Sequence, residues 1–490
     1  APEAAAVNLK QVHAISDLPG ARKQALAGTF SGHLSILGPT GEALEIFCFF
    51  KQHANRSKPL LVWMNGGPGA SSLSGLFMEH GPFLLNSRSR PATPNGSWKL
   101  FENPHAWSRD ASVLAWEQPA GVGFSRCKKA NCSILWNDET SADANLAFLR
   151  EFFRAFPQER SRDLYIAGES YAGIYVPMLT TRVLKHNDQE GLPIRLRGMM
   201  VGDGCIGYNV PGGGGSDTMH LLLQYFEQAE GGIDRVALGS ARAACGQQLF
   251  RPMMPKAMTV SCQVALRRIF ESIGPFNVYH MDGPCGPDGQ GNWGEGDAFA
   301  CGSDEAVTDY MGMIEVQKAL NAIPSNATEP LTWQMWDGDG PNYNITVADA
   351  RPYYREVLDA GIPVLIYNGL RDTALPFNGA ENWTADMGKT VSEPRRLWGS
   401  SGSAAGHVTA YANGLTFATV QGAGHLVPAD RPIPARTMIA AFLAREPLPA
   451  YNGKKCNRIW LGRGWGNFCG DGEAQSQLEG DGEEYVLRYA

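Results

Sequence analysis

Gly168-Glu169-Ser170-Tyr171-Ala172-Gly173 stands between two segments of different character. The apolar run Leu164-Tyr165-Ile166-Ala167 before it predicts a buried strand, and residues 174–179 after it predict a helix. A serine on a tight strand-to-helix turn is held in a cramped conformation, so its neighbours must be small. Ala172 occupies the last glycine place of the pattern G-x-S-x-G, so the match is loose. The alternative is a buried serine in an ordinary loop, and the rest of the chain must decide.

The composition is that of a globular protein with a sizeable core. The 490 residues are 43% apolar and 19% charged, enough for one large α/β domain with an insertion or for two to three domains. The net charge of -7 argues against a nucleic-acid partner. Apolar runs are strand-sized, so no membrane span is predicted. The chain begins at Ala1 without an initiator Met or an apolar signal region, which favours a processed, secreted form.

Asparagine sequons also favour the secretory pathway, with secretion or a lysosomal or vacuolar location as the expectation. Single N-x-S/T triplets arise by chance, but this chain has several, and none has proline in the middle. The candidate glycosylation sites are Asn55, Asn95, Asn131, Asn326, Asn344 and Asn382.

The cysteines favour disulfides. There are ten, an even number. Three pairs lie close together in polar stretches where a disulfide would close a loop, namely Cys127 with Cys132, Cys285 with Cys301, and Cys456 with Cys469. No C-x-x-C pair occurs and no histidines cluster near these residues, so no metal site is predicted.

Strand-like apolar runs recur on both sides of the serine turn, while the middle of the chain lacks them. The predicted class is α/β, with a mixed, mostly parallel sheet and helices on both faces. Residues 1–204 and 346–490 form the predicted core, and 205–345 form an inserted, mainly helical cap. Predicted strands are 29–37 and 44–50 as a hairpin, 59–64, 112–117, 164–167, 196–201, 363–367 and 415–420; predicted core helices are 141–155 and 434–443.

Four polar loops follow predicted strands. They hold Gly66-Gly67, Ser170, Asp372 and His425, and ligands of open α/β sheets gather at that edge. The order Ser, Asp, His is that of α/β-hydrolases. His425 would take the proton of Ser170, and Asp372 would orient the imidazole. Asp203 also follows a strand and is a rival acid; Asp372 is favoured because it lies one strand before the histidine strand.

The oxyanion of such a reaction needs two backbone N–H groups. Gly67 and Tyr171 are the candidates, because glycine lets the backbone approach the reacting carbonyl closely. A phosphate-binding loop is disfavoured, since no Lys-Ser/Thr follows Gly66-Gly67.

Three long motifs resemble those of the serine carboxypeptidases, a family of lysosomal, vacuolar and plant secreted enzymes. They are residues 63–72 (WMNGGPGASS), 168–173 (GESYAG) and 422–428 (GAGHLVP). The resemblance runs from about residue 25 to 445 in order and spacing. It implies an α/β-hydrolase fold with a cap, and release of the C-terminal residue of peptides. It carries Ser170, Asp372 and His425 over as the triad.

The resemblance also implies a site for the substrate's terminal carboxylate, formed by Asn65, the Gly66 backbone, Glu79 and Glu169. Two adjacent carboxyls cannot both ionise easily, so at least one pKa should rise. A protonated carboxyl can donate to the substrate carboxylate, which predicts an acidic optimum. Leu375, Leu426 and Met78 match family positions near the leaving residue's pocket, which implies a preference for an apolar terminal residue; the alternative is that they are core residues.

Departures from the family pattern are Ala70 in place of cysteine, Leu370 in place of aspartate and Asp203 in place of asparagine. They leave the triad complete but put a cap disulfide and local hydrogen bonding in doubt. The expected partner is a peptide or protein C-terminus, without cofactor or metal, and a homodimer stays among the expectations. Two other functions are weighed: an acyltransferase, disfavoured because Asn65 and Glu169 are of the peptidase type, and a protective or binding partner that retains the fold.

Overall fold

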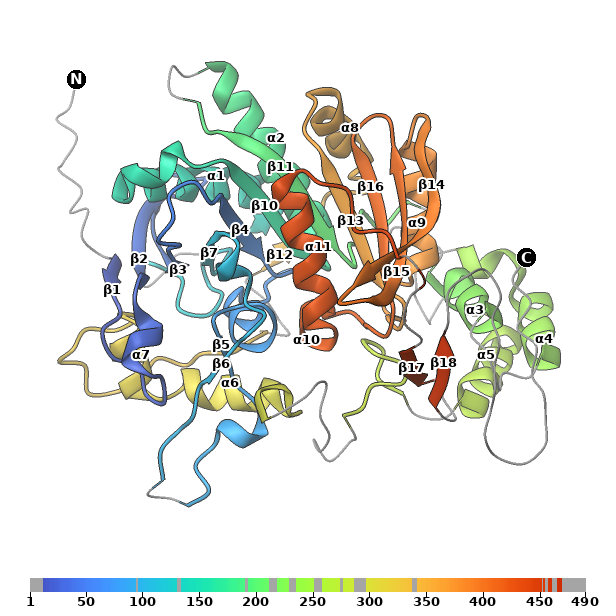
Figure 1. Cartoon of the computed structure of the whole chain (residues 1–490), viewed down its shortest axis with the longest axis horizontal. Coiled ribbons are helices and arrows are strands. Elements are labelled where there is room, and N and C mark those ends of the chain that lie inside the picture. The colour runs from blue at the N-terminus through green and yellow to red at the C-terminus, as the bar shows by residue number, and fades with distance from the viewer. Residues whose placement is uncertain are drawn as a thin grey trace.

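A sheet of twelve strands forms the centre of the molecule (Figure 1). The computed structural model describes residues 12–93, 96–129, 134–189, 193–210, 218–228, 235–250, 258–273, 276–285, 297–336, 342–451, 453, 457–460 and 465–468. In spatial order the strands are β1 (Val12–Ala14), β2 (Thr29–Leu37), β3 (Ala43–Lys51), β7 (Ser112–Trp116), β4 (Leu60–Met64), β10 (Leu164–Glu169), β11 (Leu196–Gly202), β13 (Val364–Gly369), β16 (Leu415–Val420), β15 (Ser403–Tyr411) and β14 (Val391–Ser400), with β8 (Arg126–Cys127) paired to β3.

The middle of this sheet is parallel. Strands β7, β4, β10, β11, β13 and β16 pair in parallel, and the strands toward both edges pair antiparallel. Every residue of β4, β7, β10 and β13 is buried, as expected for strands covered on both faces. The apolar runs therefore predicted these strands correctly.

Helices cover both faces of the sheet, each over its own apolar core. One core packs α1, α2, α8 and α9 on the sheet, and the other packs α6, α7, α10 and α11 on the opposite face. This confirms the predicted α/β class. The bounds are α1 (Asp138–Ala155), α2 (Ala172–Gln189), α6 (Ser303–Met311), α7 (Ile314–Ala319), α8 (Arg351–Asp359), α9 (Phe377–Met387), α10 (Val427–Asp430) and α11 (Pro432–Ala444).

The hairpin of β14 and β15 was not predicted from the sequence. The first half of β14 is largely exposed, so it shows no apolar run of the kind that marks the central strands. Short paired strands lie outside the main sheet: β5 (Phe83–Leu84) with β6 (Phe101–Glu102), β9 (Trp136–Asn137) with β12 (Tyr343–Asn344), and β17 (Asn457–Trp460) with β18 (Trp465–Phe468).

The long segment between β11 and β13 contains a helical unit with its own apolar cluster. Helices α3 (Thr218–Gln228), α4 (Arg235–Cys245) and α5 (Val260–Ile273) share this cluster, which is separate from the two cores of the sheet. They lie together at the lower right of Figure 1. The later helices of the same segment, α6 and α7, join the core of the sheet instead.

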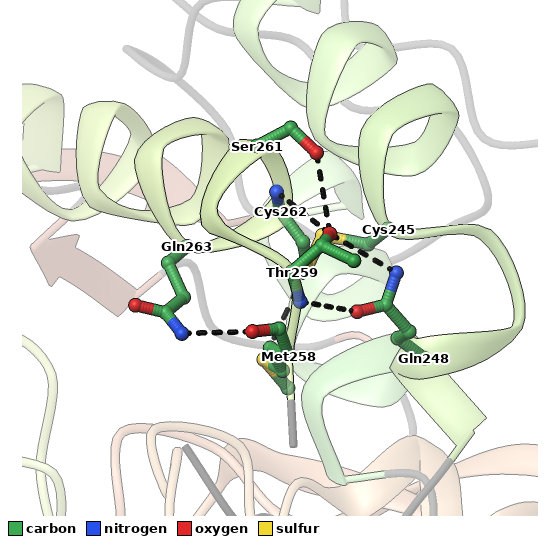
Figure 2. Close-up of a disulfide and its surroundings, with 7 residues drawn as sticks. All are labelled: Cys245, Gln248, Met258, Thr259, Ser261, Cys262 and Gln263. Atoms are coloured by element: carbon green, nitrogen blue, oxygen red, sulfur yellow. Dashed lines mark hydrogen bonds between the residues drawn. A yellow bond between two sulfur atoms is a disulfide. The ribbon is translucent and has the colours of Figure 1, made fainter. Parts of the chain in front are cut away.

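A disulfide between Cys245 and Cys262 joins the end of α4 to the start of α5 (Figure 2). Beside it, the backbone N–H of Thr259 donates to Gln248 Oε1 at 2.7 Å, so the turn into α5 is also held by a side chain. This pair was not predicted, because neither cysteine lies in the polar, loop-like context that marked the other pairs.

The disulfide Cys285–Cys301 is present as predicted. Cys127 is disulfide-bonded, but the proposed partner Cys132 and the pair Cys456–Cys469 lie outside the described residues. The remaining two cysteines, Cys48 and Cys205, are free thiols.

Four of the six sequon asparagines lie in the described part of the chain. All four are exposed, and they are Asn55, Asn326, Asn344 and Asn382. Asn95 and Asn131 lie outside the described residues. None of the helices in the described ranges is long and apolar enough to cross a membrane.

Candidate active site

The serine turn joins β10 directly to α2. Ser170 follows Glu169, the last residue of β10, and has a positive φ of 60°. The turn is crowded: a Cβ added to Gly173 would lie 2.2 Å from the carbonyl oxygen of Cys205. The close approach of Cys205 explains why the second glycine of the motif stands at 173, one place later than in G-x-S-x-G.

Asp372 and His425 come together at the same edge of the sheet. Asp372 follows β13, His425 follows β16, and their side chains are buried. The distance from His425 Nδ1 to Asp372 Oδ2 is 2.7 Å, and the other oxygen of Asp372 accepts from the Ala374 N–H at 2.8 Å. A carboxylate on Nδ1 holds the proton there, which leaves Nε2 as an acceptor.

Asp203, the rival acid, lies beside this pair. It follows β11, has a φ of 43° and is fully buried. Oxygen or nitrogen atoms of Asp203, Asp372 and His425 lie within 4.8 Å of one another. It is Asp372, however, that accepts the hydrogen bond from His425. Sequence spacing could place both aspartates at this edge but could not show which one contacts the histidine.

The glycine-rich loop after β4 lies against the serine turn. A Cβ added to Gly66 would lie 2.4 Å from the Tyr171 backbone nitrogen and 2.8 Å from the Ser170 Cβ. Gly67 has a φ of 109°, a conformation that favours glycine. The structure thus brings both candidate oxyanion donors, Gly67 and Tyr171, to the neighbourhood of the serine.

Asp138 fixes the side chain of Tyr171, a contact that the sequence did not predict. The Tyr171 hydroxyl donates to Asp138 Oδ1 at 2.6 Å, and Tyr343 donates to the same oxygen at 3.0 Å. The backbone N–H groups of Thr346 and Val347 donate to Oδ2 at 2.6 and 2.8 Å. The residue after the serine is therefore anchored to α1 and to the segment after β12.

The residues proposed for carboxylate binding also come together. Asn65 Nδ2 donates to Glu169 Oε1 at 2.8 Å, while Asn65 Oδ1 accepts from Trp63 Nε1 at 2.7 Å. These two bonds fix the orientation of the amide. Glu79 lies at the end of a single π-helical turn, η2 (Gly75–Glu79), a form that is frequent at functional sites.

Glu79 and Glu169 form a buried carboxyl pair. Burial raises the pKa of Glu79 to about 7. Burial and the nearby Glu79 charge raise the pKa of Glu169 well above its usual value. Both shifts favour a state in which the pair keeps a proton at mildly acidic pH.

Three half-buried apolar side chains match the positions implied for the leaving residue's pocket. Met78 directly precedes Glu79, Leu426 directly follows His425, and Leu375 lies three residues after Asp372. None of the three is fully enclosed in the core. Their placement is compatible with a surface that contacts a ligand.

Residues 277–282, from the segment between β11 and β13, bridge the acid and base loops and were not singled out from the sequence. The carbonyl of Val278 accepts from the backbone N–H groups of Thr373 and Ala374, both at 3.0 Å. The carbonyl of Tyr279 accepts from the His425 N–H at 2.7 Å, and the Tyr279 ring lies 4.8 Å from the His425 ring. The stretch has no periodicity, so no sequence signal marked it.

A mixed sheet with helices on both faces, and a serine, an aspartate and a histidine after its parallel strands, defines an α/β-hydrolase. The chain belongs to the serine carboxypeptidase family, whose model, described as "Serine carboxypeptidase", matches residues 19–445.

Similar proteins of known name cover most of the chain. Serine carboxypeptidase-like 46 of Arabidopsis thaliana is 30% identical over 466 residues, covering 90% of this chain and 94% of the relative. Serine carboxypeptidase 1 of Hordeum vulgare is 28% identical over 484 residues, covering 89% and 93%. A solved prohormone-processing carboxypeptidase of Saccharomyces cerevisiae shares the fold, with a TM-score of 0.66 at 20% identity, covering 89% of this chain and 96% of that one.

Proposed function

We propose that this protein is a serine carboxypeptidase that releases the C-terminal residue of peptides through an acyl-enzyme. The observation that carries the proposal is the buried pair formed by Glu79, at the end of η2, and Glu169, the residue directly before Ser170. A carboxyl pair that retains a proton can donate to a carboxylate, whereas an ionised pair would repel it. A site of this kind next to a nucleophile distinguishes the end of a peptide from its middle.

The reaction would begin at Ser170. His425 Nε2 takes the proton of the serine hydroxyl as Oγ attacks the carbonyl carbon of the last peptide bond, and later returns it to the leaving amine. Asp372 holds the proton on Nδ1 and stabilises the imidazolium that forms, consistent with the 2.7 Å separation. Water then attacks the acyl-enzyme with His425 again as the base.

The oxyanion would be held by the backbone N–H groups of Gly67 and Tyr171. One such donor contributes roughly 3–4 kcal/mol to the transition state. The bonds of Asp138 to Tyr171 support this role, because they restrain the residue whose N–H must point at the oxyanion. Asn65 and the Gly66 backbone would complete the carboxylate site with Glu79 and Glu169.

A preference for an apolar terminal residue belongs to the same proposal. Met78, Leu375 and Leu426 are half-buried near the acid, the base and the carboxylate site. Transfer of an apolar side chain into such a pocket is favourable by about 25 cal/mol for each Å² removed from water.

An N-blocked dipeptide and its C-terminal amide test the function. We expect wild type to release the last residue from the free acid, to act much more weakly on the amide, and S170A to release none. Serine-dependent acyl transfer from a sugar ester, without peptide cleavage, would instead show an acyltransferase. Turnover of none of these substrates would leave a binding or protective role.

We also propose that residues 205–345 form a cap on a core made of 1–204 and 346–490, and that the protein passes through the secretory pathway. The separate apolar cluster of α3–α5 supports the cap for this part of the range, whereas α6 and α7 pack in the core of the sheet. The disulfides support an oxidising compartment. Removal of N-glycans should lower the apparent mass of the native protein, and unchanged mobility would contradict glycosylation at the exposed sequons.

A further inference from the structure

Asp203 is a buried carboxyl that the proposed mechanism does not use. It follows β11, and Asp372 follows the neighbouring strand β13, so the two lie side by side at the edge that holds His425. Its backbone is held by β13, since the Asp203 N–H donates to the Tyr367 carbonyl at 2.8 Å. This position, one residue beyond a core strand, leaves the side chain little freedom to move away.

The hydrogen bonds of the two aspartates are not equivalent. Asp203 Oδ1 accepts from the Gly369 N–H at 2.9 Å and from Asn368 Nδ2 at 3.2 Å. Asp203 Oδ2 is buried and has no hydrogen-bond partner among the described residues. Both oxygens of Asp372, in contrast, already accept, one from Ala374 and one from His425.

Asp203 and Asp372 are fully buried and have oxygen atoms within 4.8 Å of each other, so the two carboxylates would repel each other strongly if both were ionised. One proton removes the repulsion, and Asp203 Oδ2 is the oxygen left without a donor of its own. The other titratable groups that face Asp203 are Glu169, Tyr367 and His425. Burial and the Asp372 charge raise the pKa of Asp203 well above its usual value, in agreement with the geometry.

We propose that Asp203 is a protonated positioning residue whose Oδ2–H donates to the Asp372 carboxylate. Asp372 then accepts from Asp203, Ala374 and His425, and the pair of aspartates beside the histidine carries one negative charge rather than two. The inference rests on the proposed function, because its consequence for the reaction is the orientation and charge of the Asp372–His425 pair.

D203N tests whether the Asp203 side chain is neutral. Asparagine has nearly the same shape as protonated aspartate and can still donate a hydrogen bond, but it cannot ionise. The substrate is an N-blocked amino-acid ester without a free carboxylate, so that the state of Glu79 and Glu169 is not measured. We expect kcat/KM of D203N to stay within about threefold of wild type, the effect of one altered hydrogen bond. The midpoint of the acid limb of kcat/KM, which reports His425, should stay in place.

An ionised Asp203 gives a different result. Its replacement by asparagine would then remove a full negative charge near the imidazole and lower the acid-limb midpoint by about one pH unit or more. That outcome would overturn the proposal. D203L, which has no donor, should lower kcat about 10- to 100-fold with little change in KM, as a misplaced acid–base pair does. If D203N and D203L had the same kcat and the same pH dependence of kcat/KM, and circular dichroism showed that both were folded, the proposal would also be overturned.

An infrared difference spectrum between wild type and D203N at pH 6 gives a readout independent of activity. We expect the carbonyl band of a protonated carboxyl in wild type that is absent from D203N. If wild type hydrolyses no substrate but shows this band, the proposed function fails while the protonation of Asp203 stands. If the ester is hydrolysed but the band is missing, the protonation fails and the function stands.

Discussion

Ser170 is held in a backbone conformation that costs about 1–3 kcal/mol for a residue with a side chain. Three backbone hydrogen bonds maintain it: its N–H donates to the Gly202 carbonyl at 3.0 Å, and its carbonyl accepts from Gly173 and Cys205, each at 2.9 Å. The strain therefore cannot relax without breaking contacts to β11 and α2. We infer that the turn fixes the nucleophile before any substrate arrives.

Asp372 allows a sharp test of the acid–base pair. D372N retains the size of the side chain but places an amide opposite His425 Nδ1, which favours the wrong tautomer. We expect kcat on an ester substrate to fall by about 10⁴-fold with KM nearly unchanged. Steady-state kinetics measure this, with thermal melting as the check on folding. A loss below tenfold would assign the acid role elsewhere, and D203N is the matched control.

Glu79 gives a pH-dependence prediction. Because burial raises the pKa of Glu79 to about 7, this carboxyl holds a proton below neutrality and ionises as the pH rises. KM for a free-acid peptide should therefore increase above pH 7, while kcat/KM for the corresponding ester should not follow the same curve. In E79Q the amide donates at every pH, so the rise in KM should flatten. A wild-type KM that is constant from pH 5 to 8 would contradict the carboxylate site.

At the scale of elements, the packing of α2 on the chain after β11 sets the position of the serine. Gly173 lies in the first turn of α2, where a Cβ would meet the Cys205 carbonyl. The same substitution elsewhere meets no such obstacle: a Cβ on Gly239 in α4 has no heavy atom within 4 Å.

These two glycines form a matched pair. We expect G173A to lower stability by about 1–3 kcal/mol through overpacking and to reduce kcat. G239A should raise stability by about 0.5–1 kcal/mol, because alanine is the better helix residue. Urea unfolding and ester hydrolysis measure both effects. Equal behaviour of the two variants would show that the tight contact behind the serine turn is not important.

The Cys245–Cys262 disulfide stabilises the helical unit of α3–α5. It closes a loop of 17 residues, and loops of this length contribute about 3 kcal/mol in the chain-entropy description. The double variant C245S/C262S should therefore exchange amide hydrogens faster in α4 and α5, with little change in β10 or β13. Faster exchange throughout the sheet would instead show that the unit does not open independently.

The clearest sequence signals came from strands whose burial is complete. Strands β4, β10 and β13 are buried throughout and each begins with at least four consecutive apolar residues, so their runs stand out. The hairpin of β14 and β15 and residues 277–282 lack such runs. The hairpin is fixed by pairing of β15 with the adjacent β16, and residues 277–282 are fixed by contacts with the His425 loop, which lies far away in the sequence. Glu79 was found only through the family resemblance, since a glutamate in a short helical turn is ordinarily exposed.

At the scale of the whole molecule, buried carboxyls with raised pKa values also occur outside the candidate active site. Burial raises the pKa of Glu117 to about 7, as it does for Glu79. Glu117 directly follows β7, and it accepts from Ser71 at 2.5 Å and from Trp333 Nε1 at 2.8 Å. It thus ties the glycine-rich loop to the segment between β11 and β13.

The raised pKa of Glu117 predicts how stability depends on pH. Between about pH 4.5 and 7 the native state holds a proton that the unfolded state has lost, so stability falls as the pH rises. Buried histidines oppose this trend: burial lowers the pKa of His33 and His407 to about 4, so each destabilises the native state as the pH falls below 6.5. The net curve of wild type therefore mixes two opposite contributions, and a single variant is needed to separate them.

E117Q isolates the contribution of the Glu117 carboxyl to the pH dependence of stability. The histidines are present in both proteins, so their contributions cancel in the difference. Glutamine cannot ionise, so the stability of E117Q relative to wild type should improve by about 3 kcal/mol between pH 4.5 and 8, most of it below pH 7. The Phe124 N–H donates to Glu117 Oε2 at 2.5 Å, and an amide offers a poorer acceptor there, so the prediction concerns the pH slope of the stability and not its absolute value. Urea unfolding at a series of pH values measures the difference, with E305Q, an exposed change in α6, as the control. Parallel curves for wild type and E117Q would show that Glu117 is ionised in the native state.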